Sequence, residues 1–309
     1  MKRVELRNGG MFSNVNEVVQ RLHLAHQGGF DFAIRWPRSV YRDDGRDDDP
    51  WSYFFEPCFP EDGVDVSSLE PWEEFGTIIR GADNTITPRA GWRDGGVLIF
   101  PANRHIAAQH INTRLKLKPP IQTLIDQFAD THFTGPIIGL HIRGEGRDHG
   151  GAAELRAQLP CENGVPYDQY FNLVRQELAL LPEARIFICS DSRKVIDRVA
   201  REFGDKVFWY ESSRSDFGEM HERRNSPETD HVSGYKLGED ILAEAYLLAH
   251  TDVFIHGNSN VANFVICKNP ELKNRYAYDG IRPFTLPRAL WKLAGDTANR
   301  VRRRLGLID

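Results

Sequence analysis

Residues 184–210 read ARIFICSDSRKVIDRVAREFGDKVFWY, and this stretch decides the fold class. An apolar run ends in the polar residues SDS, a segment with helical apolar spacing follows, and KVFWY begins a second apolar run. A helix between two strands favours a parallel pair, because a parallel connection has to carry the chain back to the starting end of the sheet. The stretch therefore predicts an α/β unit.

The same alternation extends through the second half of the chain. We predict strands at 135–143, 184–192, 206–210 and 251–260, and helices at 119–133, 167–181, 192–204, 238–251 and 261–269. Strands that alternate with helices over this length predict a doubly wound parallel sheet.

The first half begins with a similar but shorter pattern. A strand at 2–8 precedes the loop GGMFSN at 9–14, a helix at 15–27 that two glycines end, and a second strand at 30–36. This order predicts a βαβ unit with a loop that can approach a ligand closely. Residues 42–119 show no clear pattern.

Composition excludes several classes of protein. The chain has 309 residues and a formal net charge of −5, which gives no general attraction to nucleic acid. It has no apolar stretch of about 20 residues and no apolar leader in MKRVELRNGG. The cysteines are far apart and form no CxxC pair, so we expect reduced thiols in a cytoplasmic protein: Cys58, Cys161, Cys189 and Cys267.

Polar residues follow the predicted strands in HIRGEGRDHGG, CSDS and HGNSN. Ligands of open parallel sheets bind beyond the carboxyl ends of the strands. The guanidinium of Arg143 suits a phosphate oxygen. Ser259 and Asn260 precede a helix whose free N–H groups can hold an anion, although both residues also suit a simple helix cap.

Four further residues have two interpretations each. Asp191 and Ser192 can accept ribose hydroxyls, or they can cap the following helix. The carboxylate of Glu244 could accept two N–H groups from a guanine edge, or it could be a solvated helix position that pairs with a lysine such as Lys236. His141 is either a ligand contact or a core histidine.

The acidic run YRDDGRDDDP raises the question of a metal site. Asp47, Asp48 and Asp49 could form a DxD motif, but the surrounding charges favour a solvated loop. The histidines do not pair as HxH or HExxH, so we predict no metal site.

Three blocks in order carry a family resemblance: HIRGEGRDHGG, IFICSDSRKVIDRVAREFG and EDILAEAYLLAHTDVFIHGNSN. Over about residues 119–270 they resemble the bacterial nodulation fucosyltransferases and, more loosely, the α-1,6-, α-1,2- and protein O-fucosyltransferases. The resemblance implies a GT-B-like α/β fold of two Rossmann-like domains with a C-terminal helix. We expect an acceptor-side domain at 1–130, a nucleotide-sugar-binding domain at 131–285 and a helix at 286–309.

The resemblance also implies roles for individual residues. Arg143 matches the motif arginine that contacts the β-phosphate of the donor, and His141 matches a histidine near the guanine. Glu244 matches the acidic residue that reads the guanine edge. Asp191 matches the aspartate of its strand-end block, and Ser259 matches a serine that lines the diphosphate.

Inverting transfer needs a base for the acceptor hydroxyl and a clamp for the departing diphosphate. Arg143, helped by Ser259, could be the clamp, and Glu145 or Asp148 in the following loop could be the base. Gly144 stands where eukaryotic members often have a second arginine, which leaves the donor sugar open.

Two segments outside these blocks have alternative interpretations. Asn14 could face the cleft and place donor or acceptor, or it could belong to an ordinary tight turn with an N-cap. We predict that residues 286–309 form a basic amphipathic helix, which could lie on the inner face of an anionic membrane or pack back on the first domain.

The sequence thus predicts a cytoplasmic, metal-independent, inverting glycosyltransferase that needs no cofactor. Its donor would be GDP-fucose and its acceptor a saccharide or glycolipid hydroxyl. The alternatives are a transferase for another nucleotide sugar, a non-catalytic nucleotide- or sugar-binding protein of the same fold, and a metal-dependent transferase that uses the acidic run.

Overall fold

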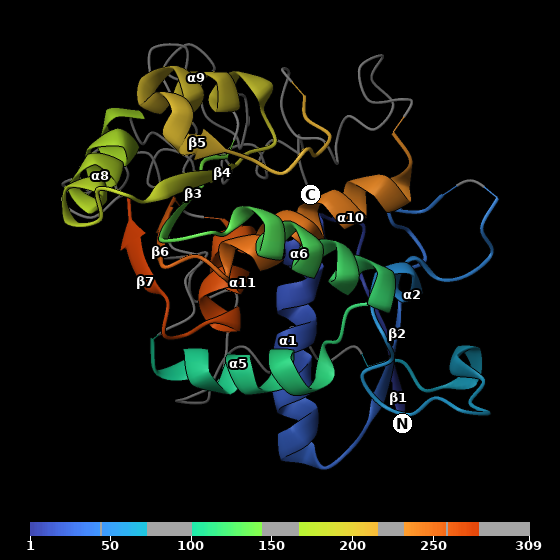
Figure 1. Cartoon of the computed structure of the whole chain (residues 1–309). Coiled ribbons are helices and arrows are strands. Elements are labelled where there is room, and N and C mark those ends of the chain that lie inside the picture. Colours follow the sequence, from blue (N-terminus) through green and yellow to red (C-terminus); the bar gives the residue numbers. More distant parts are fainter. Residues whose placement is uncertain (44, 73–100, 144–166, 216–231, 258, 278–309) are drawn as a thin grey trace, which may run out of the picture. The chain divides into compact units, whose positions relative to one another are not determined.

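The computed structural model describes residues 1–43, 45–72, 101–143, 167–215, 232–257 and 259–277 (Figure 1). By its contacts the chain divides into residues 1–277 and residues 278–309, and every element named below belongs to the first unit. The predicted helix at 286–309 and the candidate bases Glu145 and Asp148 lie outside the described residues.

The larger sheet is parallel and has the strand order β5–β4–β3–β6–β7. Its strands are β3 (Ile137–His141), β4 (Arg185–Cys189), β5 (Val207–Phe208), β6 (Val253–His256) and β7 (Lys273–Tyr276). All residues of β3 and β6 are buried, which explains their short, almost purely apolar runs.

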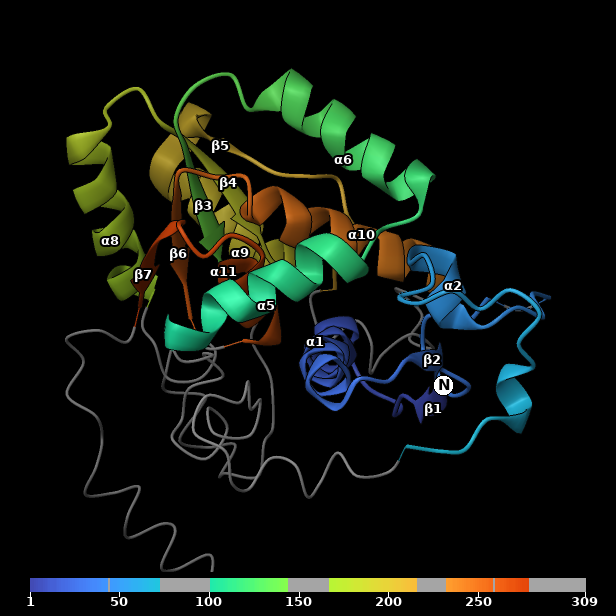
Figure 2. The same ribbon diagram turned by 90° about the horizontal axis from the view of Figure 1, so that it is seen from below.

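Helices cover both faces of this sheet (Figures 1 and 2). They are α6 (Pro119–His132), α8 (Tyr167–Leu180), α9 (Arg193–Phe203), α10 (Gly234–Leu248) and α11 (Asn260–Lys268). The chain moves outward from β3 to β5 through α8 and α9, then returns to β6 and β7 through α10 and α11. Because parallel crossovers are right-handed, this reversal puts the two sets of helices on opposite faces. It also creates a switch point between β3 and β6.

The first part of the chain forms a small parallel pair of strands with its own helices. Its elements are β1 (Lys2–Glu5), α1 (Met11–Gly28), β2 (Phe32–Arg35), α2 (Pro50–Phe54) and α5 (Pro101–Arg114). Helix α1 packs against α5 and α11, and the amide of Asn16 donates to the carbonyl oxygen of Asn260 at 3.0 Å. One hydrophobic core therefore runs from the small strand pair to the larger sheet.

Two predicted helix boundaries were wrong at their N-terminal ends. Helix α1 begins at Met11 and not at residue 15, because Gly10 is its N-cap and the hydroxyl of Tyr41 accepts the N–H of Met11. Helix α10 begins at Gly234 and not at residue 238, because Ser233 caps it. The C-terminal end of α1 is as predicted, since Gly29 follows it with φ of 66°.

The remaining outcomes concern the fold class and the poorly patterned segment. The α/β, GT-B-like fold with parallel sheets is confirmed. The segment between residues 42 and 119 showed no clear pattern, and its described residues contain α2, α5 and a short 3₁₀ turn at Val66–Ser68. The domain division at 1–130, 131–285 and 286–309 stays a prediction.

Candidate active site at the carboxyl ends of β3, β4 and β6

A pocket of about 290 Å³ lies where β3, β4 and β6 end. Arg143, Asp191 and Ser259 follow these strands, and all three line the pocket. Helix α10 supplies Asp240 and Glu244 to its wall. The start of α1, residues 10–13, and Tyr41 also line it. Residues far apart in the sequence therefore meet at the switch point of the sheet.

One side of the pocket is rich in hydrogen-bond donors. Ser259 is the N-cap of α11 and accepts the N–H of Ala262 at 3.0 Å, so its own proton is available to His141 Nδ1, 3.4 Å away. Burial, together with the nearby Arg143 and His256, lowers the pKa of His141 to about 3. His141 is therefore a neutral imidazole, and Arg143 and the N-terminus of α11 supply the positive potential.

Tyr41 joins the first part of the chain to this side. Its hydroxyl accepts the N–H of Met11 at 3.0 Å and keeps its own proton available. Burial raises the pKa of Tyr41 to about 12, so the hydroxyl stays protonated at neutral pH. The ring packs against Trp36 and Phe54, with centroids 5.3 and 6.3 Å away, which fixes its orientation.

The other side of the pocket carries two carboxylates one helical turn apart. Glu244 Oε1 accepts from Ser212 Oγ at 2.6 Å and from Arg214 Nη2 at 2.9 Å. Burial raises the pKa of Glu244 to about 7, while Arg214 and Ser212 act in the opposite direction. Asp240 accepts the N–H of Ser213 at 2.8 Å and pairs with Lys236.

Six of the residues proposed from the sequence line this one pocket: His141, Arg143, Asp191, Glu244, Ser259 and Asn260. Ser192 does not line it, and although Ser192 is the N-cap of α9, its side chain makes no capping bond. Asn14 does not line it either, because its amide donates to the carbonyl oxygens of Arg7 and Gly9, each at 3.2 Å, and so supports the loop before α1.

The suggested Glu244–Lys236 pair does not form. Lys236 pairs with Glu239 and Asp240, and the cation beside Glu244 is Arg214. Four further residues that line the pocket were not predicted from the sequence: Tyr41, Ser212, Ser213 and Asp240. Only Asp240 carried a local signal, since it precedes Glu244 by four residues and so lies on the same helix face.

The acidic run is more ordered than a solvated loop. Asp49 accepts the backbone N–H groups of Trp36 and Trp51, at 2.9 and 3.0 Å, and caps α2. Asp43 accepts the N–H of Tyr235 in the first turn of α10, at 2.9 Å. Asp47 and Asp48 are exposed, as predicted. Among the described residues, no group of three or more His, Cys, Asp or Glu side chains could hold a metal ion.

Two curated proteins show sequence similarity to this chain. It is 27% identical to Nodulation protein Z of Sinorhizobium fredii over 154 residues, which is 48% of this chain and 44% of that protein. It is equally identical to Nodulation protein Z of Bradyrhizobium diazoefficiens over 154 residues, 38% of that protein. The matched segment thus spans less than half of the length of either relative. No family model matches the chain.

Solved structures match much more of the chain. The structure of NodZ alpha-1,6-fucosyltransferase co-crystallized with GDP has a TM-score of 0.55 and 20% identity, covering 89% of this chain and 93% of that one. This chain has the fold of the fucosyltransferases. POFUT1 in complex with GDP gives a TM-score of 0.50 at 10% identity, over 89% of this chain and 98% of that one.

The predicted resemblance to the nodulation fucosyltransferases is therefore confirmed in sequence and in fold, and the structural neighbour NodZ is an alpha-1,6-fucosyltransferase. In the described part of the chain, no helix is both long and apolar enough to span a bilayer.

Proposed function

We propose that this protein is a fucosyltransferase that takes fucose from GDP-fucose and passes it to a saccharide hydroxyl. The observation that carries the proposal is the polarity of the pocket. A cation and a helix N-terminus, from Arg143 and α11, face one part of the ligand space, and the carboxylates of Asp240 and Glu244 face another. A nucleoside diphosphate has the matching polarity, with an anionic diphosphate and a base edge that bears N–H donors.

We propose that transfer proceeds with inversion and without a metal. The acceptor oxygen forms a bond to the anomeric carbon while the bond from that carbon to the β-phosphate oxygen breaks, and the electron pair leaves with the diphosphate. Arg143, Ser259 and the first N–H groups of α11 stabilise the charge that develops there. The proton of the acceptor hydroxyl passes to a carboxylate, for which Glu145 and Asp148 remain the candidates.

The acceptor and the cellular location also belong to this proposal. We propose a saccharide or glycolipid acceptor that meets the first part of the chain, and a cytoplasmic enzyme whose basic residues 286–309 contact an anionic membrane surface. Both proposals are supported by the sequence pattern alone.

Ligand-induced stabilisation tests the donor proposal first. GDP and GDP-fucose should raise the melting temperature, because a ligand at 100 times its Kd adds about 2.7 kcal/mol of stability. Arg143→Ala should abolish the shift, while Arg175→Ala should keep it, since the side chain of Arg175 on α8 is exposed and pairs with Glu202.

Transfer of labelled fucose to an acceptor library in EDTA then tests the activity. A shift with UDP alone would replace the fucose donor by another nucleotide sugar. GDP binding without transfer or donor hydrolysis would favour the non-catalytic alternative. Activity that EDTA abolishes would contradict the metal-independent mechanism.

A further inference from the structure

The segment 212–214, just after β5, connects to α10 at two successive turns. Ser212 Oγ and Arg214 Nη2 donate to Glu244, and the backbone N–H of Ser213 donates to Asp240. Ser212, Asp240 and Glu244 are buried residues, with 8%, 3% and 5% of their surface exposed. These contacts are thus shielded from water, where charge-assisted hydrogen bonds are strong.

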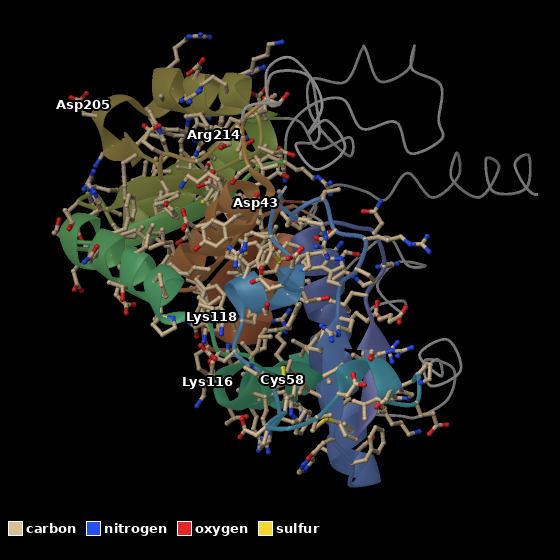
Figure 3. The ribbon with its side chains drawn as sticks, turned by 90° about the vertical axis from the view of Figure 1, so that its right-hand side faces the viewer. Asp43, Cys58, Lys116, Lys118, Asp205 and Arg214 are labelled. Atoms are coloured by element: carbon tan, nitrogen blue, oxygen red, sulfur yellow. The ribbon has the colours of Figure 1, made fainter. Side chains whose placement is uncertain are left out.

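Arg214 also fixes the segment that carries it. Its Nη2 donates to the carbonyl oxygen of Tyr210 at 2.8 Å, and its Nη1 donates to that of Ser212 at 2.9 Å. Figure 3 shows Arg214 beside the ribbon of α10. One guanidinium therefore ties the backbone at 210–212 to the side chain of Glu244, and neither can shift without breaking several hydrogen bonds.

Both contacts to the carboxylate use the same oxygen. Ser212 and Arg214 bond to Oε1 of Glu244. An ionised carboxylate offers about four acceptor positions, so the Oε2 side retains its capacity for a ligand. Because Glu244 lines the pocket, its Oε2 can accept hydrogen bonds from a ligand that lies against α10.

The protonation state of Glu244 decides which base edge it can meet. An ionised carboxylate only accepts, which suits the N1–H of guanine and repels the N1 lone pair of adenine. A protonated carboxyl can donate, and it would accommodate adenine. The two donors at Oε1 favour the ionised form, whereas desolvation and the neighbouring carboxylates of Asp240 and Asp191 oppose it.

We propose that Ser212 and Arg214 are positioning residues that set the base selectivity of the pocket. They shift Glu244 toward its ionised form, which only accepts hydrogen bonds, and they aim that carboxylate at the nucleobase. This inference rests on the proposed function in so far as the ligand is a nucleoside diphosphate. Base selectivity would then depend on the segment 212–214 after β5, whereas Arg143 follows β3.

Titration calorimetry with GDP and ADP at pH 6.5 and pH 8.5 tests the proposal on the full chain. The pKa of Glu244 is about 7 in the wild type, and we expect Ser212→Ala to raise it by about one. The ionised fraction of Glu244, and with it the affinity for GDP, should then fall about eightfold at pH 6.5 and less than about 1.5-fold at pH 8.5. The binding of ADP should not weaken, so the ratio of the Kd for ADP to the Kd for GDP should fall at pH 6.5. Ser68→Ala, on an exposed turn, is the matched control and should keep the wild-type ratio.

Equal weakening of GDP and ADP at both pH values would overturn the proposal, because loss of structural support alone has no preference for a base. Arg214→Lys should lower the GDP-to-ADP preference in the same pH-dependent way, since one ammonium cannot make all three contacts. If the wild type binds UDP and not GDP, the proposed donor fails, and the same comparison uses UDP and CDP.

If the wild type binds no nucleotide, carboxyl ¹³C NMR of labelled glutamate still measures the titration of Glu244 without ligand. Ser212→Ala should move that titration to higher pH. An unchanged titration would sink the proposal whatever the ligand.

Discussion

Gly238 in the second turn of α10 allows a quantitative prediction, because two opposing effects of Gly238→Ala can be compared. Alanine is the better helix former by about 1 kcal/mol, so propensity alone predicts stabilisation. A β-carbon at Gly238, however, would lie 2.2, 2.5 and 3.0 Å from three atoms of the Phe54 ring. Carbon atoms in contact prefer about 3.5–4.0 Å, so the overlap exceeds about 1 Å.

Phe54 has little freedom to move aside. It is fully buried, its ring stacks on Tyr235 with centroids 5.6 Å apart, and it meets Tyr41 edge-on. Overpacking a tight core costs about 1–3 kcal/mol, and an overlap of this size belongs near the upper end. Subtracting the gain in propensity, we expect Gly238→Ala to destabilise by about 2 kcal/mol, or to lower the melting temperature by about 4 °C.

Urea unfolding with Gly9→Ala as the control measures this difference. A β-carbon at Gly9 would make only ordinary contacts, the nearest at 3.7 Å, so that variant should be neutral or slightly more stable. In a Phe54→Leu background, Gly238→Ala should cost less than it does alone, by about 0.5–3 kcal/mol. Gly238→Ala that is as stable as the wild type would refute the reasoning.

Three further predictions concern buried polar groups. Glu177→Gln should destabilise the protein by about 1.5–3 kcal/mol in urea unfolding, because its fully buried carboxylate binds Lys273 and Arg275 of β7. The control Glu202→Gln should cost less than about 1 kcal/mol, since Glu202 forms an exposed pair with Arg175. Asp49→Ala should cost about 2 kcal/mol in the same assay and the exposed Asp48→Ala almost nothing; equal costs would contradict the capping role of Asp49. Burial, together with the neighbouring His23, His26 and Arg114, lowers the pKa of His110 to about 4. The folded state therefore has its full stability from a neutral His110 above about pH 6.5 and loses it as the pH falls toward 4. His110→Phe should flatten this part of a melting-temperature profile, and an unchanged slope would exclude His110 as its source.

The sequence predicted best where local pattern and packing agree. The strands β3, β4 and β6 are short apolar runs because both faces of the sheet are covered. Each one lies inside its predicted range, but they end two, three and four residues before the predicted ends. The polar strand ends also predicted correctly that Arg143, Asp191 and Ser259 share one pocket. The topology of a parallel sheet brings such ends together without any further information.

The sequence predicted poorly where a contact partner is distant. Strand β7 reads KNRY and has no apolar alternation, since it is the edge of the sheet and its cations are held by Glu177 on α8. The donors to Glu244 lie 30 and 32 residues before it, on a segment without a motif. Asp43 binds the N-terminus of α10 across 192 residues, so local spacing could not reveal that it is a cap.

The contact between Asn16 and Asn260 has a consequence for how the chain folds. Helix α1 is synthesised well before α11, which forms part of its packing surface and lies 244 residues later at this contact. At about 5–20 residues per second, a ribosome needs roughly 12–50 s to make that stretch. During this time the apolar face of α1 lacks one of its final partners. The early helix is therefore a natural client for chaperones, and the pocket, which α1 and α11 both line, can be completed only after α11 has been made.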